Sequence, residues 1–209
     1  MNIHPPKFVK RFIKHLYPTM IWSFNSEANS KKVFLTFDDG PTEEITYWIL
    51  DTLDKYNAKA TFFCLGKNVE QYNVQYNEII RRGHVVANHT YSHLKGWGFD
   101  AGSYMQDVDM ANDLIGSNIF RPPYARITVA QARRVSERYN IIMWDTLSAD
   151  YSNVVTPRQC VKNVVDNYKG GSIVVFHDSI KASRNMKYAL PRVLEDFKKK
   201  GYSCESIIL

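Results

Sequence analysis

The sequence predicts an α/β protein built around a parallel sheet, and two observations support this prediction. From residue 33 onward, short apolar runs alternate with longer segments whose apolar residues recur at helical spacing. The chain has 209 residues, of which 44% are hydrophobic, so it can bury one sizeable core. No internal repeat or linker divides it. We therefore expect an amino-terminal segment, residues 1–30, followed by a single domain, residues 31–209.

Several apolar runs have the length of β-strands and end at polar or turn-forming residues. The expected strands are Val33–Phe37, Thr61–Leu65, Val85–Asn88, Asn118–Arg121, Ile141–Trp144, Ser172–Phe176 and Tyr202–Ile208. Helical segments separate consecutive strands, and this order favours parallel pairing. A closed or nearly closed barrel would remove the exposed edges of such a sheet, and a doubly wound open sheet is the alternative.

The helices between the strands are marked by their caps and by their apolar spacing. Pro41 and Thr42 open the first helix, in which Ile45, Ile49 and Leu53 recur at helical spacing. Five further helices are expected. The second ends near Arg82, before Gly83, and the third runs from a cap at Ser103 to about Ile115. The fourth covers Ala130–Tyr139, the fifth runs from Thr156-Pro157 to about Tyr168, and the last ends at Gly201.

The amino-terminal segment has the pattern of a basic amphipathic helix. Its apolar face holds Phe8, Val9, Phe12, Ile13, Leu16 and Tyr17, and its basic face holds Lys7, Lys10, Arg11 and Lys14. The apolar face either packs against the domain or contacts an anionic membrane surface peripherally. Because basic residues interrupt the run, neither a signal peptide nor a transmembrane helix is indicated. We expect a cytoplasmic protein or one bound to the inner face of the membrane.

Charge and cysteine content narrow the class of protein. The net charge of +6 indicates solvated basic faces or an anionic partner. Nucleic acid is not expected, because the sequence has no zinc finger, no basic groove-binding helix and no RNP-like motif. Cys64, Cys160 and Cys204 lack metal-type spacing and are odd in number, which indicates a reducing compartment and places Cys64 in the core. We expect a monomer.

Polar residues that can bind metal or transfer protons follow the predicted strands. They are Asp38, Asp39, His89, His93, Arg121, Asp150, His177 and Asp178. In a β/α barrel the carboxyl ends of the strands converge on one face, so these side chains should meet. His89 and His93 are four residues apart, and on a helical turn both imidazoles would lie on one side. A third ligand from another strand end would complete an open catalytic metal site.

Five motifs, in order, make the chain resemble the polysaccharide deacetylases, the NodB homology domain of carbohydrate esterase family four. The resemblance covers residues 31–209. The motifs are Thr36-Phe37-Asp38-Asp39-Gly40-Pro41, Asn88-His89-Thr90-Tyr91-Ser92-His93, Arg121-Pro122-Pro123-Tyr124, Trp144-Asp145 with Asp150-Tyr151, and Val175-Phe176-His177-Asp178.

The resemblance implies a distorted (β/α) barrel with about seven parallel strands. It also implies one divalent metal ion, most commonly zinc, with cobalt, nickel and manganese as alternatives. Asp39, His89 and His93 would hold this ion. Such an ion makes water acidic enough to act as a nucleophile near neutral pH.

The same resemblance assigns the proton transfers. Asp38 would be the general base, held in place by Arg121, and His177 the general acid, oriented by Asp150. The backbone N–H of Tyr124 would stabilise the oxyanion that forms when water attacks an acetamide carbonyl. The departing amine needs a proton, which His177 would supply.

The sequence specifies the substrate less closely than it specifies the reaction. Ala125, Tyr151 and Phe176 replace the glycine, tryptophan and leucine that are usual in the family, and these changes would alter the walls of the substrate groove. Tyr151 could stack on a sugar face, and Trp97 either does so or packs locally.

Three functions are consistent with these residues. The first is removal of N-acetyl groups from an N-acetylhexosamine-containing glycan or glycolipid. The second keeps the metal but hydrolyses a cyclic amide or another non-sugar, and the third is a catalytically idle carbohydrate-binding module. An idle module should lose its base or a ligand, and this sequence retains them all. A glycosidase with paired carboxylates fits less well, because the two histidines and the arginine would then be unexplained.

Overall fold

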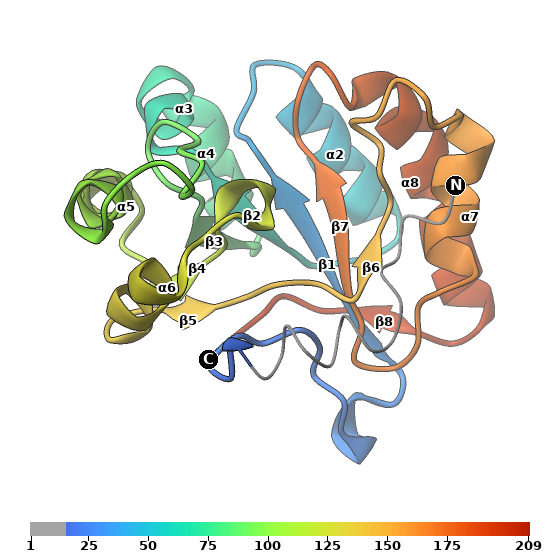
Figure 1. The fold of residues 1–209 in the computed structure, drawn as a ribbon. Helices are drawn as coiled ribbons and strands as arrows, with labels where there is room; N and C mark the ends of the chain where they lie inside the picture. Colours follow the sequence, from blue (N-terminus) through green and yellow to red (C-terminus); the bar gives the residue numbers. More distant parts are fainter. Residues whose placement is uncertain (1–15) are drawn as a thin grey trace.

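The computed structural model describes residues 16–209, whose fold is drawn in Figure 1. Helices lie around the outside of a curled parallel sheet. The strands are β1 (Lys32–Asp38), β2 (Ala60–Cys64), β3 (Val85–Asn88), β4 (Ile119–Phe120), β5 (Asn140–Ile141), β6 (Thr146–Leu147), β7 (Ile173–His177) and β8 (Ser203–Cys204). The helices are η1 (Glu27–Asn29), α2 (Ile45–Lys55), α3 (Gly66–Gln71), α4 (Asn73–Arg81), α5 (Ala101–Ile115), η2 (Pro123–Ala125), α6 (Val129–Ser136), α7 (Pro157–Val165) and α8 (Ser183–Lys199).

The sheet confirms the predicted fold class. Its strand order is β5-β4-β3-β2-β1-β7-β6, and β8 pairs with the first residues of β1. All these pairings are parallel, so the carboxyl ends of β1, β2, β3 and β7 reach the same edge. Asp38 at the end of β1 lies opposite His177 at the end of β7. The polar strand ends predicted from the sequence are therefore neighbours.

One stretch of chain, residues 140–147, joins the two ends of the sheet. Its first residues form β5 and pair with β4, whereas its last residues form β6 and pair with β7. The gap between them is bridged by Ile21, whose N–H donates to Ile141 (2.9 Å) and whose carbonyl accepts from Met143 (2.7 Å). The single strand predicted over Ile141–Trp144 is thus wrong, because the backbone changes partners in the middle of it.

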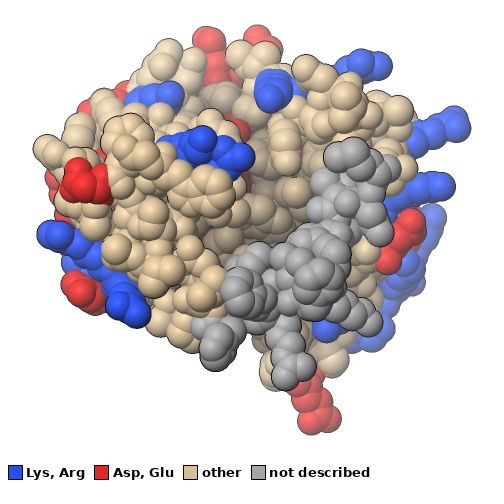
Figure 2. All heavy atoms as spheres, in the orientation of Figure 1, with Lys and Arg blue, Asp and Glu red and all other residues tan. Residues whose placement is uncertain are grey.

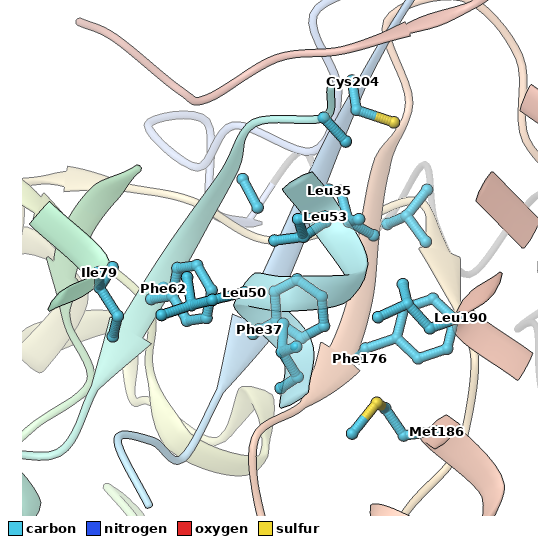
Figure 3. Packing of buried hydrophobic residues seen from close by; sticks show 14 of the residues in the cluster. Leu35, Phe37, Leu50, Leu53, Phe62, Ile79, Phe176, Met186, Leu190 and Cys204 are labelled. Atoms are coloured by element: carbon cyan, nitrogen blue, oxygen red, sulfur yellow. The ribbon is translucent and has the colours of Figure 1, made fainter. Parts of the chain in front are cut away.

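The core lies between the sheet and the helices that cover its outer face (Figure 3). The rings of Phe37 and Phe62 stack with centroids 5.1 Å apart, and Phe176 lies 6.2 Å from Phe37. Leu50 of α2 and Leu190 of α8 belong to the same fully buried cluster. Cys64, Cys160 and Cys204 are free and buried, which confirms Cys64 as a core residue.

Three predicted helix boundaries need correction. The first helix begins at Ile45 and not at Pro41, because the Thr42 N–H donates to Thr46 Oγ1 (2.7 Å) and keeps residues 41–44 in a loop. The helix expected to end near Arg82 is two helices, α3 and α4, separated at Tyr72 by a non-helical ψ of 48°.

The third boundary concerns α5, which is capped by Asp100 and not by Ser103. The Asp100 carboxylate accepts from the N–H groups of Gly102 (2.7 Å) and Ser103 (3.0 Å). A carboxylate satisfies the free N–H groups of a first turn better than a residue inside that turn can. The cap predicted at Thr156, followed by Pro157, is confirmed.

Most of the predicted amphipathic stripe, Phe8–Ile13 with its basic residues, lies outside the described residues. The residues that follow pack on the barrel: the Tyr17 hydroxyl donates to the Ile127 carbonyl (3.0 Å), and Met20 is buried. Among residues 16–209, no helix is long and apolar enough to cross a membrane. We propose that the structural domain includes residues 17–30, which the sequence had assigned to the preceding segment.

Deletion of residues 1–25 should lower the free energy of unfolding by about 3 kcal/mol or more, because it removes the buried Met20 and the backbone bonds of Ile21 and Phe24 to the barrel. Deletion of residues 1–15 is the matched reference, and the unfolding midpoint of the 1–25 deletion should lie below that of the 1–15 deletion. Urea unfolding followed by circular dichroism measures both. Equal stability of the two truncated proteins would contradict the proposed boundary.

Candidate active site

Strand ends and the loops after them form a pocket of about 550 Å³ at the carboxyl edge of the sheet. Its lining residues are Asp38, Asp39, His89, His93, Pro122, Tyr124, Arg126, Trp144, Leu147, Tyr151, Val175, His177, Ser179 and Lys181. Figure 2 shows this side of the molecule hollowed, with Lys and Arg side chains beside the hollow. The pocket brings together residues that are up to 143 positions apart in the sequence, from Asp38 to Lys181.

Asp39, His89 and His93 form a compact group of metal-binding atoms. One oxygen or nitrogen from each lies within 4.8 Å of the others. Asp39 Oδ1 is 3.2 Å from His93 Nε2 and 3.8 Å from His89 Nε2. Two imidazoles and one carboxylate that leave one side open are the donor set typical of a catalytic zinc site.

The backbone that places this group is irregular. Asp39, Thr90 and His93 have φ values of 78°, 68° and 64°, all in the left-handed region. The turn is held by the Asn88 side chain, which accepts from the Thr90 N–H at 2.8 Å, and by the Thr90 hydroxyl, which accepts from the Leu94 N–H at 3.0 Å. The helical turn expected over residues 89–93 is therefore wrong, although both imidazoles do reach one site.

Both histidines are suited to bind a cation near neutral pH. The Nδ1 of His89 lies 2.7 Å from the Arg121 carbonyl, so it carries the proton and leaves Nε2 with a lone pair. Burial lowers the pKa of His89 to about 4. Burial and the neighbouring His89 likewise lower the pKa of His93 to about 4. Both imidazoles are therefore neutral, as ligands must be.

Asp38 is held by Arg121 in a buried ion pair. Arg121 is 0% exposed, and its Nη1 donates to Asp38 Oδ1 (2.6 Å) and to the Thr36 hydroxyl (2.8 Å). Burial by itself would raise the pKa of Asp38, but the charge and hydrogen bond of Arg121, together with His89 and His177, outweigh burial and lower that pKa. Asp38 is therefore ionised, with Oδ1 occupied and Oδ2 facing His89 Nε2 at 4.0 Å.

His177 is held by Asp150 across the pocket. The Asp150 carboxylate binds the His177 ring at Nδ1 (2.7 Å) and its backbone N–H (2.8 Å). Burial would lower the pKa of His177, but the charge and hydrogen bond of Asp150 raise it to about 9. His177 is therefore protonated near neutral pH, in contrast to the two histidines beside Asp39. Asn185 of α8 fixes the Asp150 loop through three backbone carbonyls, those of residues 150, 152 and 155.

Asp178, which the sequence placed among the polar strand ends, points away from the pocket. Its carboxylate accepts from the hydroxyls of Thr42 (2.7 Å) and Thr46 (2.5 Å) and anchors the loop that follows Asp39. A Cβ atom on Gly40 would lie 2.3 Å from this carboxylate, so only glycine fits there. Burial raises the pKa of Asp178 to about 7.

The predicted substrate-contacting residues fall into two groups. Tyr124 and Tyr151 line the pocket: the Tyr124 ring lies 4.5 Å from that of His93, and the Tyr151 ring lies 4.9 Å from that of His177. Trp97 is 56% exposed beside the pocket but does not line it. Phe176 is 0% exposed in the core, so its prediction as a groove residue is wrong.

Sequence reasoning missed several lining residues, and for some of them a signal was present. Side chains alternate across a strand, so a pocket-facing His177 places Val175 in the pocket and Phe176 on the opposite face. Trp144 belonged to a quoted motif but was not assigned to the site. Arg126 and Lys181 lie in loops and follow no periodic pattern, so only the folded chain shows where they are.

Comparison with known proteins identifies the family. The polysaccharide deacetylase family model matches residues 25–143, which is more than half of the chain, so this protein belongs to that family. Two proteins of Bacillus cereus, each named peptidoglycan-N-acetylglucosamine deacetylase, are 33% and 31% identical to it. The matches cover 86% and 90% of this chain and 68% and 92% of those proteins.

A solved structure supports the same assignment. The Bc1960 peptidoglycan N-acetylglucosamine deacetylase, crystallised with 4-naphthalen-1-yl-N-hydroxybenzamide, matches with a TM-score of 0.84 and 30% identity over 95% of this chain and 94% of that one. The named relatives are hydrolases of carbon–nitrogen bonds other than peptide bonds. These findings confirm the family, the fold and the enzyme class predicted from the sequence.

Because Asp150 raises the pKa of His177, Asp150→Asn in chelator-treated protein should lower that pKa from about 9 toward its ordinary value of about 6.5, since burial is then opposed only by the weaker attraction of Asp39 and Asp38. A raised pKa stabilises the folded state fully below about 6.5, and this contribution is lost as the pH rises through about 9. The substitution should therefore cost about 3 kcal/mol near pH 6 and less near pH 10. Histidine NMR titration and urea unfolding measure the two effects. A His177 pKa that Asp150→Asn leaves unchanged would contradict the assigned cause.

Proposed function

We propose that this protein is a metal-dependent deacetylase that removes acetyl groups from N-acetylhexosamine residues of a peptidoglycan-type glycan. The observation that carries the proposal is a single pocket that combines three cation ligands, an ionised carboxylate and a protonated imidazole. Metal-assisted hydrolysis of an unactivated amide uses a bound cation, a proton acceptor for the attacking water and a proton donor for the leaving amine. The names of the relatives support the choice of glycan.

Asp39, His89 and His93 are the residues that would hold the metal, and their chemistry fits zinc. Two neutral imidazoles and one carboxylate suit this ion and leave room for substrate. A divalent ion bound there would supply the Lewis acidity that makes water nucleophilic near neutral pH and polarises the acetamide carbonyl. Cobalt, nickel and manganese also bind imidazole and carboxylate donors, so the identity of the ion is decided by elemental analysis of the purified protein.

The protein's own groups would move the protons. Asp38 accepts a proton from the attacking water at Oδ2, since Arg121 occupies Oδ1. The Tyr124 N–H stabilises the negative charge that develops on the carbonyl oxygen. When the C–N bond breaks, His177 donates its Nε2 proton to the amine, because Nδ1 is bound to Asp150. The products are acetate and a free amino sugar.

The first test of the function is acetate release. Purified protein should deacetylate chitooligosaccharides or peptidoglycan fragments, lose this activity in excess chelator, and regain it when about one equivalent of zinc is added. Elemental analysis gives the metal content at each step. Turnover by metal-free protein would contradict metal dependence, and hydrolysis of cyclic imides without acetate release from any sugar would favour the non-sugar alternative.

A sharper test separates the two neighbouring aspartates. Asp38→Asn should retain the metal and lose a factor of about 10² or more in kcat, because it removes the proton acceptor and no ligand. Asp39→Asn should instead lose metal, and added zinc should partly restore its activity by mass action. Elemental analysis and acetate assays distinguish the two variants.

The fold must be checked in parallel, because Asp38→Asn leaves the buried Arg121 charge without its partner and should destabilise the protein. Metal content is therefore compared only between variants whose circular dichroism matches that of the wild type. The assignment would be reversed if folded Asp38→Asn lost its metal while Asp39→Asn kept it and remained inactive.

A further inference from the structure

Two cations at the mouth of the pocket have no part in the chemistry proposed above. Inside the pocket, Asp38 is paired with Arg121 and Asp150 with His177. Arg126 and Lys181 also line the pocket, and within residues 16–209 neither forms a salt bridge with a carboxylate. A guanidinium and an ammonium that are exposed beside a substrate pocket are free to bind an anionic group of the substrate.

The backbone around Arg126 is held by hydrogen bonds to the neighbouring loop, residues 96–99. Its carbonyl accepts from the Gly96 N–H (2.9 Å), and Gln131 Nε2 donates to the carbonyls of Gly96 (2.8 Å) and Phe99 (2.9 Å). A Cβ atom on Gly96 would lie 2.5 Å from the Arg126 carbonyl oxygen, so the two loops meet as closely as their backbones allow. The Arg126 guanidinium lies 5.2 Å from the centre of the exposed Trp97 ring. An aromatic face and a cation are thereby presented together at the rim.

Lys181 lies on the other side of the pocket. It follows β7, whereas Arg126 follows β4, and in the sheet these strands lie on opposite sides of β1. Its Nζ is 5.9 Å from the centre of the Tyr151 ring, which in turn contacts His177. The rim therefore carries one cation beside Trp97 and another beside Tyr151, the ring that contacts the protonated His177.

We propose, resting on the deacetylase function above, that Arg126 and Lys181 select glycans whose sugars next to the target N-acetylhexosamine carry carboxylates. A glycan strand that crosses the pocket would place its neighbouring sugars over the two sides of the rim. On one side Trp97 would stack on a sugar face while Arg126 binds the carboxylate, and on the other Lys181 would bind a second carboxylate. Charge at the rim then distinguishes acidic from neutral glycans of equal length.

The experiment uses zinc-loaded protein and two matched tetrasaccharides. In the first, N-acetylglucosamine alternates with a sugar that bears a lactyl-ether carboxylate, and in the second each carboxylate is converted to a primary amide. Acetate release gives kcat/KM for both, and the readout is their ratio. The variants are Arg126→Gln and Lys181→Gln, with Arg134→Gln as a control because Arg134 is an exposed arginine of α6 that does not line the pocket.

The wild type should prefer the acid over the amide by about tenfold at low salt, and by less at high salt because exposed charges are screened. Each of Arg126→Gln and Lys181→Gln should lower the ratio, the double variant should bring it near one, and Arg134→Gln should leave it unchanged. A change in folding alone would lower both rates together and leave the ratio as it was. Trp97→Ala should lower both rates several-fold at a constant ratio.

A wild-type ratio near one, or a ratio that survives in the double variant, would overturn the proposal. That result is distinct from failure of the deacetylase function, in which neither tetrasaccharide would release acetate. Equal release from both would leave the catalytic assignment intact and remove only the charge selection.

Discussion

The buried guanidinium of Arg121 is the interaction on which the pocket depends. The guanidinium donates to Asp38 and Thr36 of β1 and to the carbonyls of residues 142 and 143. The backbone carbonyl of Arg121 lies against the Nδ1 of His89. A charge that is 0% exposed is tolerated only when its donors are satisfied and a counter-ion is close. This requirement fixes β1, the turn after β3 and the segment that closes the barrel relative to one another. The position of Asp38, the proposed base, and the tautomer of His89, a proposed ligand, follow from it.

Environment gives residues of the same type different roles in this pocket. Asp38 is buried beside an arginine and ionised, whereas the positive φ of Asp39 turns the next carboxylate toward two imidazoles. Among the histidines, burial without a close carboxylate bond keeps His89 neutral, while the Asp150 carboxylate keeps His177 protonated. Groups whose pKa values are driven apart in this way can act as acid and base at one pH. In the proposed function, the same separation would supply neutral ligands for a cation and a proton donor for the leaving amine.

Much of the fold could be predicted because strands and helices leave different periodicities. The apolar runs located β1, β2, β3 and β7, and parallel pairing then required their polar ends to meet. The sequence pattern therefore predicts that the side chains of Asp38, Asp39, His89 and His177 share one site. Such a prediction succeeds when the signal is local, as it is for a short buried strand followed by polar residues.

What the sequence by itself determined was the order of the elements, the parallel sheet and the cluster of polar residues at its carboxyl edge. The tertiary structure alone decided that residues 140–147 split between two strands, because that stretch pairs with β4 at one end and β7 at the other. It also decided that Phe176 faces the core and that Arg126 and Lys181 stand at the rim. Periodicity shows which residues share a face, but which face is inside, and where a loop lies, depends on contacts between segments distant in sequence.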